Sequence, residues 1–442
     1  QRYSAIVRHF GMVVPGGRFR ETYYWDTYWI VRGLLVCDMV ATARGVVENL
    51  LQDVHSFGFV PNGGRIYYLD RSQPPLLTEM VLQVHEAAPN MPWLARALPL
   101  LELEYQFWMD PERGHVVFLP QALVPTADGT LGRLNVYHSS VSTPRPESYR
   151  EDLSTAMAAE QRLDRKRTEV FRELRTGAES GWDFSSRWLD AGTGADGGTV
   201  HALDTINAGT IVPVDLNCIL YRVELGLARA HRHLANVNGS VLASLATAKA
   251  YEEAAIRRAQ AIKALLWNQR LGSFRDYRLD GEGGRGAPSS VVSLSDFAAP
   301  LWAGLFDTAS DDGAMLVESL RLSGLLQAGG AATTRLSTGQ QWDAPNAWAP
   351  LQLMLIEGLE GLGGQAAHTL AEAVSSAWLQ NCFLTWQLTA HMQEKYDAAK
   401  PGRSGGGGEY EPQVGFGWSN GAVLVLLARN RTPNANPVLV SQ

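Results

Sequence analysis

The sequence predicts an all-α fold of about twelve helices joined by long loops. Apolar residues recur at intervals of three and four over most of the 442 residues, which is the periodicity of amphipathic helices. Alternating β-branched residues never form a run long enough to indicate a sheet of any size. Helices in this number, without a sheet, can pack in only a few ways, and a double ring of alternating helices is one of them.

The predicted helices follow one another along the whole chain. The first is well defined, because apolar residues keep helical spacing from Ile30 to Leu50 and a His-Ser-Phe-Gly breaker follows. Two short segments, Ile66–Leu69 and Val116–Leu119, have strand-like patterns and are expected to form hairpins in loops. The helical patterns cover 28–55, 75–87, 93–108, 153–175, 215–234, 241–268, 295–306, 312–327, 347–360, 365–380, 383–394 and 419–429.

Long loops rich in Gly, Pro and Asn separate some of these helices, near 109–150, 190–213, 270–292 and 398–418. Loops of more than about 12 residues inside a compact chain are uncommon and usually functional. The run Gly405–Gly408 resembles a flexible linker, but aromatic and polar residues follow it at once, and we interpret it as part of a site loop. Because no domain linker is found, we expect a single domain over residues 1–442.

The composition is that of an ordinary globular protein, with 45% hydrophobic and 19% charged residues. The net charge is −7 and the Lys and Arg residues are scattered, which excludes the basic surface of a nucleic-acid-binding protein. No run approaches the ~20 apolar residues of a membrane span, and the start at Gln1 lacks the pattern of a signal peptide. Cys37, Cys218 and Cys382 show neither metal-ligand nor disulfide spacing, so we expect buried free thiols.

Six clusters of aromatic, acidic, amide and guanidinium side chains interrupt the helical pattern. Such side chains suit a polyol, because they offer stacking surfaces, acceptors and donors. Taken singly, each cluster also has a simpler explanation as a helix cap or a salt-bridging loop. The clusters are Pro15–Asp26; Asn62 with Arg71–Pro75; Arg145–Ser148; Glu179–Trp188; Gln340–Pro350; and Glu394–Asp397 with Gly405–Gly408, Glu409–Tyr410 and Gly415–Gly421.

The fourth cluster contains an acid in an unusual setting. Asp183 lies between Trp182 and Phe184. Bulky aromatic neighbours raise the pKa of a carboxyl group, and a general acid that works at neutral pH requires a raised pKa.

The six clusters, in this order and from about residue 13 to about residue 425, resemble the trehalase family. Pro-Gly-Gly-Arg-Phe at 15–19 and Gln-Trp-Asp-x-Pro at 341–345 are similar to the two signature patterns of that family. The glycine run followed by Glu-Tyr and Gly-Phe-Gly-Trp is a third match. One match could arise by chance, but six matches in the same order could not.

The resemblance implies an (α/α)6 barrel that hydrolyses α,α-trehalose to two glucoses with inversion, without a metal or cofactor. It places the general acid at Asp183 and the general base at Glu394. Asp183 would protonate the bridging oxygen, and Glu394 would deprotonate a water molecule on the opposite face of the sugar. The substrate contacts that it implies are Arg18, Trp25, Asp26, Asn62, Arg71, Ser72, Gln73, Arg145, Pro146, Glu147, Gly181 and Glu409.

The three arginines among these contacts, Arg18, Arg71 and Arg145, are expected to fork onto hydroxyl and carboxylate groups. We also expect cationic neighbours to keep Glu394 ionised while Asp183 stays protonated. The implied ligand is the small molecule trehalose, and we expect a monomer. The stretch Tyr28–Leu35 is more similar to eukaryotic than to bacterial family members, which weakly favours a secreted or cell-surface enzyme.

The sequence departs from the family pattern at three positions. Ala347 stands where Gly is usual, Val414 where Glu is usual, and Ser419 where Thr is usual. The first motif also begins only about a dozen residues after Gln1, so we expect a short or truncated N-terminal segment. Two alternatives stay open: another (α/α)6 enzyme that acts on a disaccharide, and an inactive trehalose-binding protein.

Overall fold

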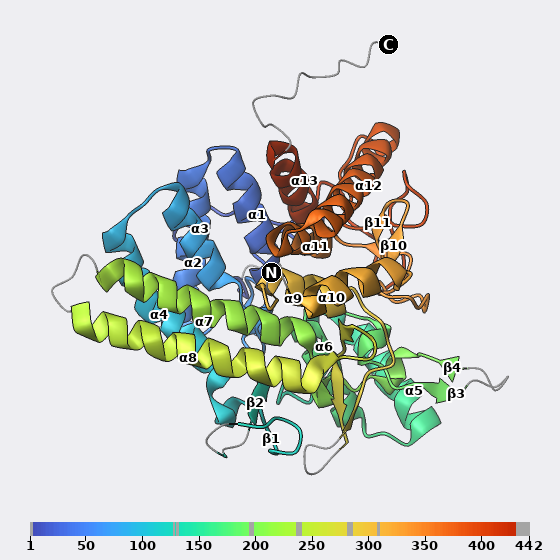
Figure 1. The fold of residues 1–442 in the computed structure, drawn as a ribbon. Helices are drawn as coiled ribbons and strands as arrows, with labels where there is room; N and C mark the ends of the chain where they lie inside the picture. Colours follow the sequence, from blue (N-terminus) through green and yellow to red (C-terminus); the bar gives the residue numbers. More distant parts are fainter. Residues whose placement is uncertain are drawn as a thin grey trace, which may run out of the picture.

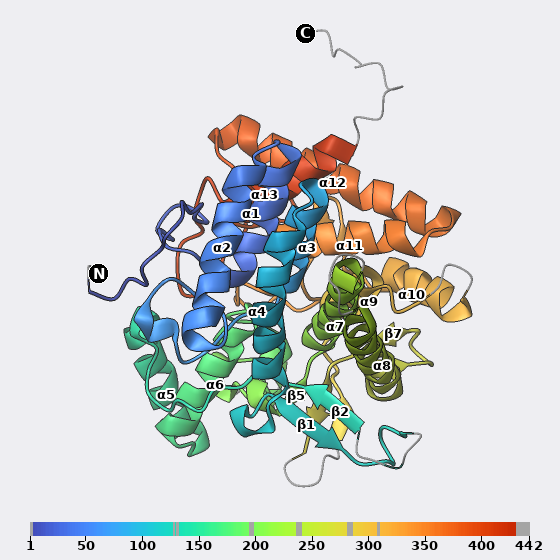
Figure 2. The same ribbon diagram turned by 90° about the vertical axis from the view of Figure 1, so that its left-hand side faces the viewer.

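The computed structural model describes residues 3–126, 129, 132–193, 199–235, 241–280, 286–306 and 310–429. Within these ranges the chain forms thirteen α-helices and only small antiparallel sheets of two or three strands. Figures 1 and 2 show the helices gathered around one core, with the short strands in the connecting loops. The predicted all-α fold is therefore confirmed.

The helices account for most of the ordered structure. They are α1 (Tyr24–Val36), α2 (Val40–Phe57), α3 (Leu77–Ala87), α4 (Met91–Met109), α5 (Tyr149–Leu163), α6 (Arg167–Glu179), α7 (Val214–Ala235), α8 (Val241–Leu266), α9 (Ser295–Ala303), α10 (Asp311–Leu322), α11 (Ala349–Leu362), α12 (Gln365–Thr389) and α13 (Gly417–Arg429). Each packs an apolar stripe on its neighbours. In α6, for example, Val170, Leu174 and Ala178 follow one another at four-residue spacing and are all buried.

The strands form hairpins and small patches between the helices. They are β1 (Val116–Leu119), β2 (Gly132–Asn135), β3 (Gly192–Thr193), β4 (Thr199–Val200), β5 (Ile211–Val212), β6 (Trp267–Asn268), β7 (Ser273–Phe274), β8 (Tyr277–Leu279), β9 (Gly286–Pro288), β10 (Leu326–Gln327), β11 (Gly330–Ala331), β12 (Asn346–Ala347) and β13 (Tyr396–Asp397). The pairing of β12 with β13 matters most, because Ala347 opposes Tyr396 and two distant motif segments are thereby joined.

Helices pack in pairs around a core rich in tryptophan. The most extensive contacts join α7 with α8, α1 with α13, α9 with α11 and α11 with α12. Eight tryptophan side chains are fully buried: Trp29, Trp93, Trp108, Trp182, Trp188, Trp342, Trp348 and Trp378. Most tryptophans of the chain therefore build the core, and only some of them reach the ligand site described below.

Two of the predicted helices are each divided in the structure. The predicted segment 28–55 forms α1 and α2, and the predicted segment 153–175 lies within α5 and α6. Asp38 and Asp164 adopt positive φ angles of 57° and 54° in the two turns. Glycine usually occupies such a position after a helix, so the sequence carries no clear turn signal at either break.

Three further expectations were wrong in detail. The predicted helices 365–380 and 383–394 form one helix, α12, which ends where Ala390 adopts a φ of 58°. Ile66–Tyr68 forms a 3₁₀ turn rather than a strand, whereas Val116–Leu119 pairs with β2 as predicted. Cys37 is exposed, while Cys218 and Cys382 are buried free thiols as expected. Parts of the predicted loops 109–150, 190–213 and 270–292 lie outside the described residues.

None of the helices in the described ranges has the length and apolar character needed to cross a membrane.

The first and last helices of the barrel meet at two glycines. A Cβ atom on Gly33 of α1 would lie 2.7 Å from the Cα atom of Gly421 in α13, and a Cβ atom on Gly421 would lie 2.2 Å from the carbonyl oxygen of Trp29. Only backbone atoms face one another there, so neither side can move aside as a flexible side chain would. The α1–α13 contact therefore requires small residues at both positions.

We expect Gly33→Ala to lower the free energy of unfolding by about 1–3 kcal/mol, because an added methyl group overpacks a rigid contact. Gly361→Ala in α11 is the matched control, since nothing lies within 4 Å of its Cβ position. Gly361→Ala is expected to raise the free energy of unfolding by roughly 0.5–1 kcal/mol, because alanine has the higher helix propensity. Urea denaturation of both variants measures the difference, and equal effects would contradict the packing argument.

Candidate functional site

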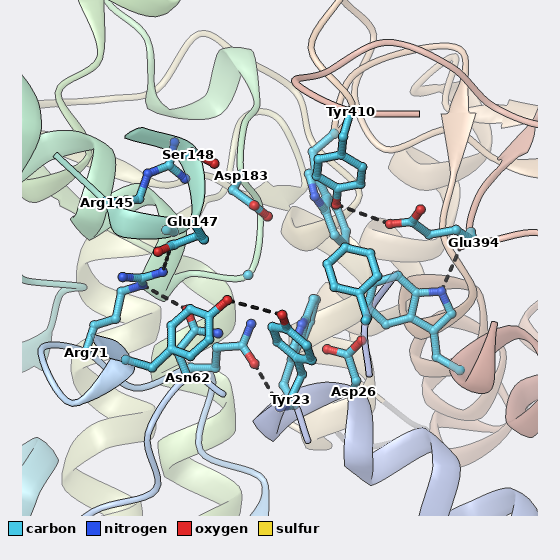
Figure 3. A pocket seen from close by; sticks show the side chains of 18 of the residues that line it. Tyr23, Asp26, Asn62, Arg71, Arg145, Glu147, Ser148, Asp183, Glu394 and Tyr410 are labelled. Atoms are coloured by element: carbon cyan, nitrogen blue, oxygen red, sulfur yellow. Dashed lines mark hydrogen bonds and ion pairs between the residues drawn. The ribbon is translucent and has the colours of Figure 1, made fainter. Parts of the chain in front are cut away.

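A cavity with twenty lining residues brings several of the sequence clusters together. Figure 3 shows Asp183 and Glu394 entering it from opposite sides, with Asp26 on the wall between them. Its walls come from segments that are far apart in the sequence. The lining residues are Phe19, Tyr23, Trp25, Asp26, Asn62, Tyr68, Arg71, Gln73, Arg145, Glu147, Ser148, Ala178, Gly181, Asp183, Trp342, Trp348, Glu394, Tyr410, Phe416 and Trp418.

Most of the residues selected from the sequence line this cavity. Those that do are Trp25, Asp26, Asn62, Arg71, Gln73, Arg145, Glu147, Gly181, Asp183 and Glu394. The other four, Arg18, Ser72, Pro146 and Glu409, are not among the lining residues. Each of them touches or adjoins a residue that is: Arg18 stacks on Tyr410 at 3.7 Å, Glu409 bonds to Arg145 at 3.2 Å, and Ser72 and Pro146 are chain neighbours of lining residues.

Asp183 follows the end of α6 by four residues and is held by its backbone. Its carbonyl oxygen accepts a hydrogen bond from the side-chain amide of Gln341. Gly181, two residues earlier, has a φ of 76°, and a Cβ atom there would lie 2.7 Å from the Trp25 ring. Glycine therefore lets Trp25 pack directly beneath the backbone that carries Asp183.

The Asp183 carboxyl group takes no hydrogen bond from another side chain in the described part of the chain. Burial raises its pKa to about 7, although the nearby Arg145 guanidinium opposes this shift. The prediction from the sequence, that the surroundings of Asp183 raise its pKa, agrees with this direction. At neutral pH a substantial fraction of the group is protonated.

Glu394 has a different environment. Its carboxylate accepts hydrogen bonds from the backbone N–H of Gln413 at 2.7 Å and from the Tyr410 hydroxyl at 3.2 Å. The Trp418 indole N–H donates to its backbone carbonyl at 2.8 Å. Burial raises the pKa of Glu394, and the Gln413 N–H and the ammonium group of Lys395 act against that rise.

The arginines are distributed differently from the expectation. Arg145 and Arg71 act on Asp183, where they oppose the rise of its pKa, and only Arg18 acts on Glu394. Burial outweighs these cationic neighbours, so the pKa of Glu394 is raised despite Arg18 and Lys395. The carboxylate of Glu394 thus depends mainly on its two hydrogen-bond donors and Lys395 for stabilisation.

Arg71 and Arg145 are fixed in the cavity wall by other buried groups. Arg71 donates from Nε to Asn62 Oδ1 at 2.8 Å and forms a short ion pair with Glu147. Arg145 pairs with Asp152 at 2.6 Å. Burial alone would raise the pKa of Glu147, but the two guanidinium groups outweigh it and hold that pKa below its ordinary value.

Asp26 presents a second free carboxyl group. It is buried in the first turn of α1, and no other side chain of the described residues hydrogen-bonds to it. Burial raises its pKa well above the ordinary range, and the charges of Glu394 and Asp183 raise it further. Such an acceptor without a protein partner is typical of a group that bonds to a ligand.

Apart from Trp25, sequence reasoning did not select the aromatic side chains of the cavity wall. Trp342 and Trp348 stack face to face, with ring centroids 4.0 Å apart, and Tyr410 and Trp418 lie in motifs already noted. Their position inside the matched clusters was the available signal. Tyr23 carried the same signal, because it lies in the first cluster, whereas Tyr68, whose hydroxyl is 3.1 Å from that of Tyr23, carried none. Flat rings on several sides of a polar cavity suit the faces of sugar rings.

The three departures from the family pattern lie outside the list of lining residues. Ala347 is fully buried in β12, and Ser419 donates to the carbonyl of Gln393 at 2.6 Å. Val414 is 42% exposed and forms an isolated bridge with Gln393. Position 414 does not line the cavity, so the absence of a carboxylate there leaves the cavity wall unchanged.

Within the described ranges, no group of three or more His, Cys, Asp or Glu side chains is arranged to hold a metal ion.

Residues 1–430 match the family model for Trehalase. The chain belongs to the trehalase family. A trehalase from Apis mellifera is 38% identical over 432 residues, which are 97% of this chain and 64% of that protein. A periplasmic trehalase from Citrobacter koseri is 41% identical over 418 residues, which are 94% of this chain and 67% of that protein.

The fold of a trehalase-family enzyme is also found in solved structures. The neutral trehalase of Saccharomyces cerevisiae superposes with a TM-score of 0.71 at 24% sequence identity, over 97% of this chain and 77% of that chain. This likeness confirms the (α/α)6 barrel. The chain spans slightly less than two thirds of the Apis mellifera trehalase.

We expect Asp183→Asn to stabilise this trehalase-family chain near neutral pH. The folded state binds more protons than the unfolded state between about pH 4 and 7, because folding raises the pKa of Asp183 from 3.8 to about 7. Stability is therefore lost as pH rises through this window. The shift corresponds to on the order of 4 kcal/mol, and we expect roughly 1–3 kcal/mol of gain at pH 7, because Asn keeps the cost of burying a polar group.

Asp343→Asn is the matched control for this measurement. Asp343 is also fully buried near the cavity, but its carboxylate accepts hydrogen bonds from Ser185, Ser186 and Thr334 at 2.8–3.1 Å. Its substitution is expected to destabilise by about 1–3 kcal/mol. Denaturation at pH 5 and pH 7 compares the two variants. A loss of stability in Asp183→Asn at pH 7 would show that the environment of Asp183 does not disfavour its charge.

Proposed function

We propose that this chain is an α,α-trehalase that hydrolyses trehalose to two glucoses with inversion, with Asp183 as general acid and Glu394 as general base. The observation that carries the proposal is the difference between two carboxyl groups that face one cavity, one half-buried and one buried. Asp183 has no side-chain donor and a pKa near 7, whereas Glu394 accepts two hydrogen bonds. Pairs of carboxyl groups with divergent environments are typical of the acid and base of glycosidases.

The proposed reaction moves one proton at each side of the substrate. Asp183 donates its proton to the oxygen that bridges the two sugars, as the bond from that oxygen to one anomeric carbon breaks. Glu394 accepts a proton from a water molecule, whose oxygen forms the new bond to that carbon on the opposite face. One β-glucose and one α-glucose result.

The remaining lining residues are proposed to bind the two glucose units. Asn62, Arg71, Gln73, Arg145 and Glu147 offer donors and acceptors on one side of the cavity. Asp26 offers a free acceptor, Trp25 a ring, and Gly181 a close backbone approach. Of the residues behind the wall, Arg18 and Glu409 support Tyr410 and Arg145, and Ser72 and Pro146 hold the backbone beside Arg71 and Arg145.

The lining of the cavity suits a sugar, because it combines aromatic rings with charged and amide side chains. The yeast neutral trehalase and the Citrobacter koseri periplasmic trehalase carry the activity in their names. Similarity over nearly the whole of this chain to such trehalases supports the same substrate here.

The decisive experiment follows hydrolysis of α,α-trehalose by NMR at early times. We expect equal α- and β-glucose from the parent chain, and a loss of kcat of about 10²–10⁴-fold in Asp183→Asn and in Glu394→Gln. α-Glucosyl fluoride separates the two roles, because a fluoride leaving group needs no protonation. Asp183→Asn is expected to hydrolyse the fluoride, and an inactive variant would contradict its role as acid. Trehalose binding without glucose release by the parent would instead indicate a binding protein.

The pH dependence of the parent enzyme gives a second test. Only protonated Asp183 can donate, and burial raises its pKa to about 7. We therefore expect kcat/KM for trehalose to fall roughly tenfold per pH unit above about pH 7. Hydrolysis of α-glucosyl fluoride serves as the internal control and should not show this alkaline loss. If both substrates lose activity together above pH 7, another group than Asp183 controls the alkaline limb.

A further inference from the structure

Helix α6 ends beside the cavity and carries two buried charged residues one turn apart. Arg175 and Glu179 are 3% and 0% exposed, and neither lines the cavity. Residues four apart in a helix lie on the same face. The reaction proposed above uses neither residue, although burying two charges away from a substrate is costly unless each is fully bonded. Their bonding partners are therefore informative.

Glu179 receives donors from two separate loops. Its carboxylate accepts hydrogen bonds from the backbone N–H of Ser72 at 3.0 Å and from the backbone N–H of His138 at 2.8 Å. His115 Nε2 lies 3.0 Å from the same carboxylate. Burial would raise the pKa of Glu179, but His115 and the backbone donors outweigh it and keep that pKa below its ordinary value. The group is thus an ionised acceptor for several donors at once.

Arg175 binds the same two loops with the opposite polarity. Its guanidinium donates to the carbonyl oxygens of Thr143 and Pro144, each at 2.7 Å. It also forms a short ion pair with Asp70. Glu179 therefore accepts hydrogen bonds from backbone N–H groups, whereas Arg175 donates to backbone carbonyls and pairs with a carboxylate.

These contacts lie directly next to the two arginines of the cavity wall. Arg71 stands between Asp70, which binds Arg175, and Ser72, which binds Glu179. Arg145 follows Pro144, whose carbonyl binds Arg175. The helix that holds the neighbours of both arginines also leads, four residues beyond Glu179, to Asp183. One rigid element therefore sets the acid and both arginines relative to one another.

We propose that Arg175 and Glu179 are positioning residues, which fix Arg71 and Arg145 at the geometry that the sugar requires. The proposal rests on the proposed function for its effect on catalysis, but the anchoring itself concerns the protein alone. Sites of this kind need their groups held within about 0.5 Å, and a displacement of about 1 Å can cost 10²-fold in rate. Loss of an anchor should therefore act through the arginines rather than through the general stability of the barrel.

The first test compares Glu179→Gln with Glu357→Gln. Gln is isosteric with Glu, but its NH₂ group would face backbone donors and leave one of them without an acceptor. Glu357 is a matched control, since it is a partly buried acid that pairs with Arg32 at 2.5 Å and with Arg429, neither of which lines the cavity. We expect kcat/KM for trehalose to fall about 100-fold in Glu179→Gln and to change less than threefold in Glu357→Gln. A fall of less than threefold in Glu179→Gln would overturn the proposal.

A double-mutant cycle with Arg71→Ala separates positioning from a merely structural role. If Glu179 acts through Arg71, kcat/KM for trehalose should be little lower in the double variant than in Arg71→Ala alone, because the two residues act as one unit. If the fold-decrease in kcat/KM of the double variant equals the product of the two single fold-decreases, the proposal is overturned, even if both single variants are impaired. Should Glu179→Gln not fold, Arg175→Lys enters the same cycle, since lysine keeps the charge but not the fork that binds two carbonyls.

Hydrogen exchange provides a readout that does not depend on activity. The backbone amides of Ser72 and His138 are expected to exchange faster in Glu179→Gln than in the parent, and at the parent rate in Glu357→Gln. Unchanged exchange at both amides would overturn the anchoring. If the parent chain does not hydrolyse trehalose, the proposed function fails, while faster exchange at these two amides would still support the anchoring by α6.

Discussion

The burial of carboxyl groups in one polar cavity is the constraint on which the rest of the structure depends. Asp26 and Glu394 are buried and Asp183 is half-buried, and burial is the largest influence on the pKa of each of them. A double ring of helices suits this requirement, because many segments can reach one enclosed end. Neighbouring groups then act differently on each acid: Arg145 lowers the pKa of Asp183, while the Gln413 N–H and Lys395 lower that of Glu394, and burial raises both.

The organisation of the site into layers follows from the same constraint. The arginines that face the cavity are ionised in a dry wall, so each needs a counter-charge behind it, such as Glu147 for Arg71 and Asp152 for Arg145. Arg71 and Arg145 themselves belong to the two loops that precede α3 and α5. Arg175 and Glu179 bind the backbone of these loops and connect them to a helix. The wall arginines are thus neutralised by acids behind them, and Arg175 and Glu179 lie further from the cavity and hold the loops that carry the arginines.

Much of this could be predicted from the sequence, and the exceptions have physical reasons. Helical periodicity located nearly every helix, and ten of the fourteen selected residues line the cavity. The breaks at Asp38 and Asp164 were missed because neither turn uses the glycine that usually marks one. Tyr68 was missed because it lies outside the clusters and nothing local distinguishes a tyrosine that faces a cavity from one in the core. Glu179 lay inside a recognised cluster, but its partners are more than forty residues away, and only the fold brings them together.

The contact between Gly33 and Gly421 has a consequence for the order in which the protein is built. These residues belong to the first and the last helix of the ring, so the ring can close only after α13 has left the ribosome. Contacts between such distant parts of a chain carry a high entropic cost and form slowly. Trp418 lies in α13 and donates a hydrogen bond to the backbone carbonyl of Glu394, so this contact forms only when α13 packs against α1. The cavity therefore takes its shape only once α13 has been synthesised, and a nascent chain without α13 leaves the aromatic-rich contact surface of α1 uncovered until then.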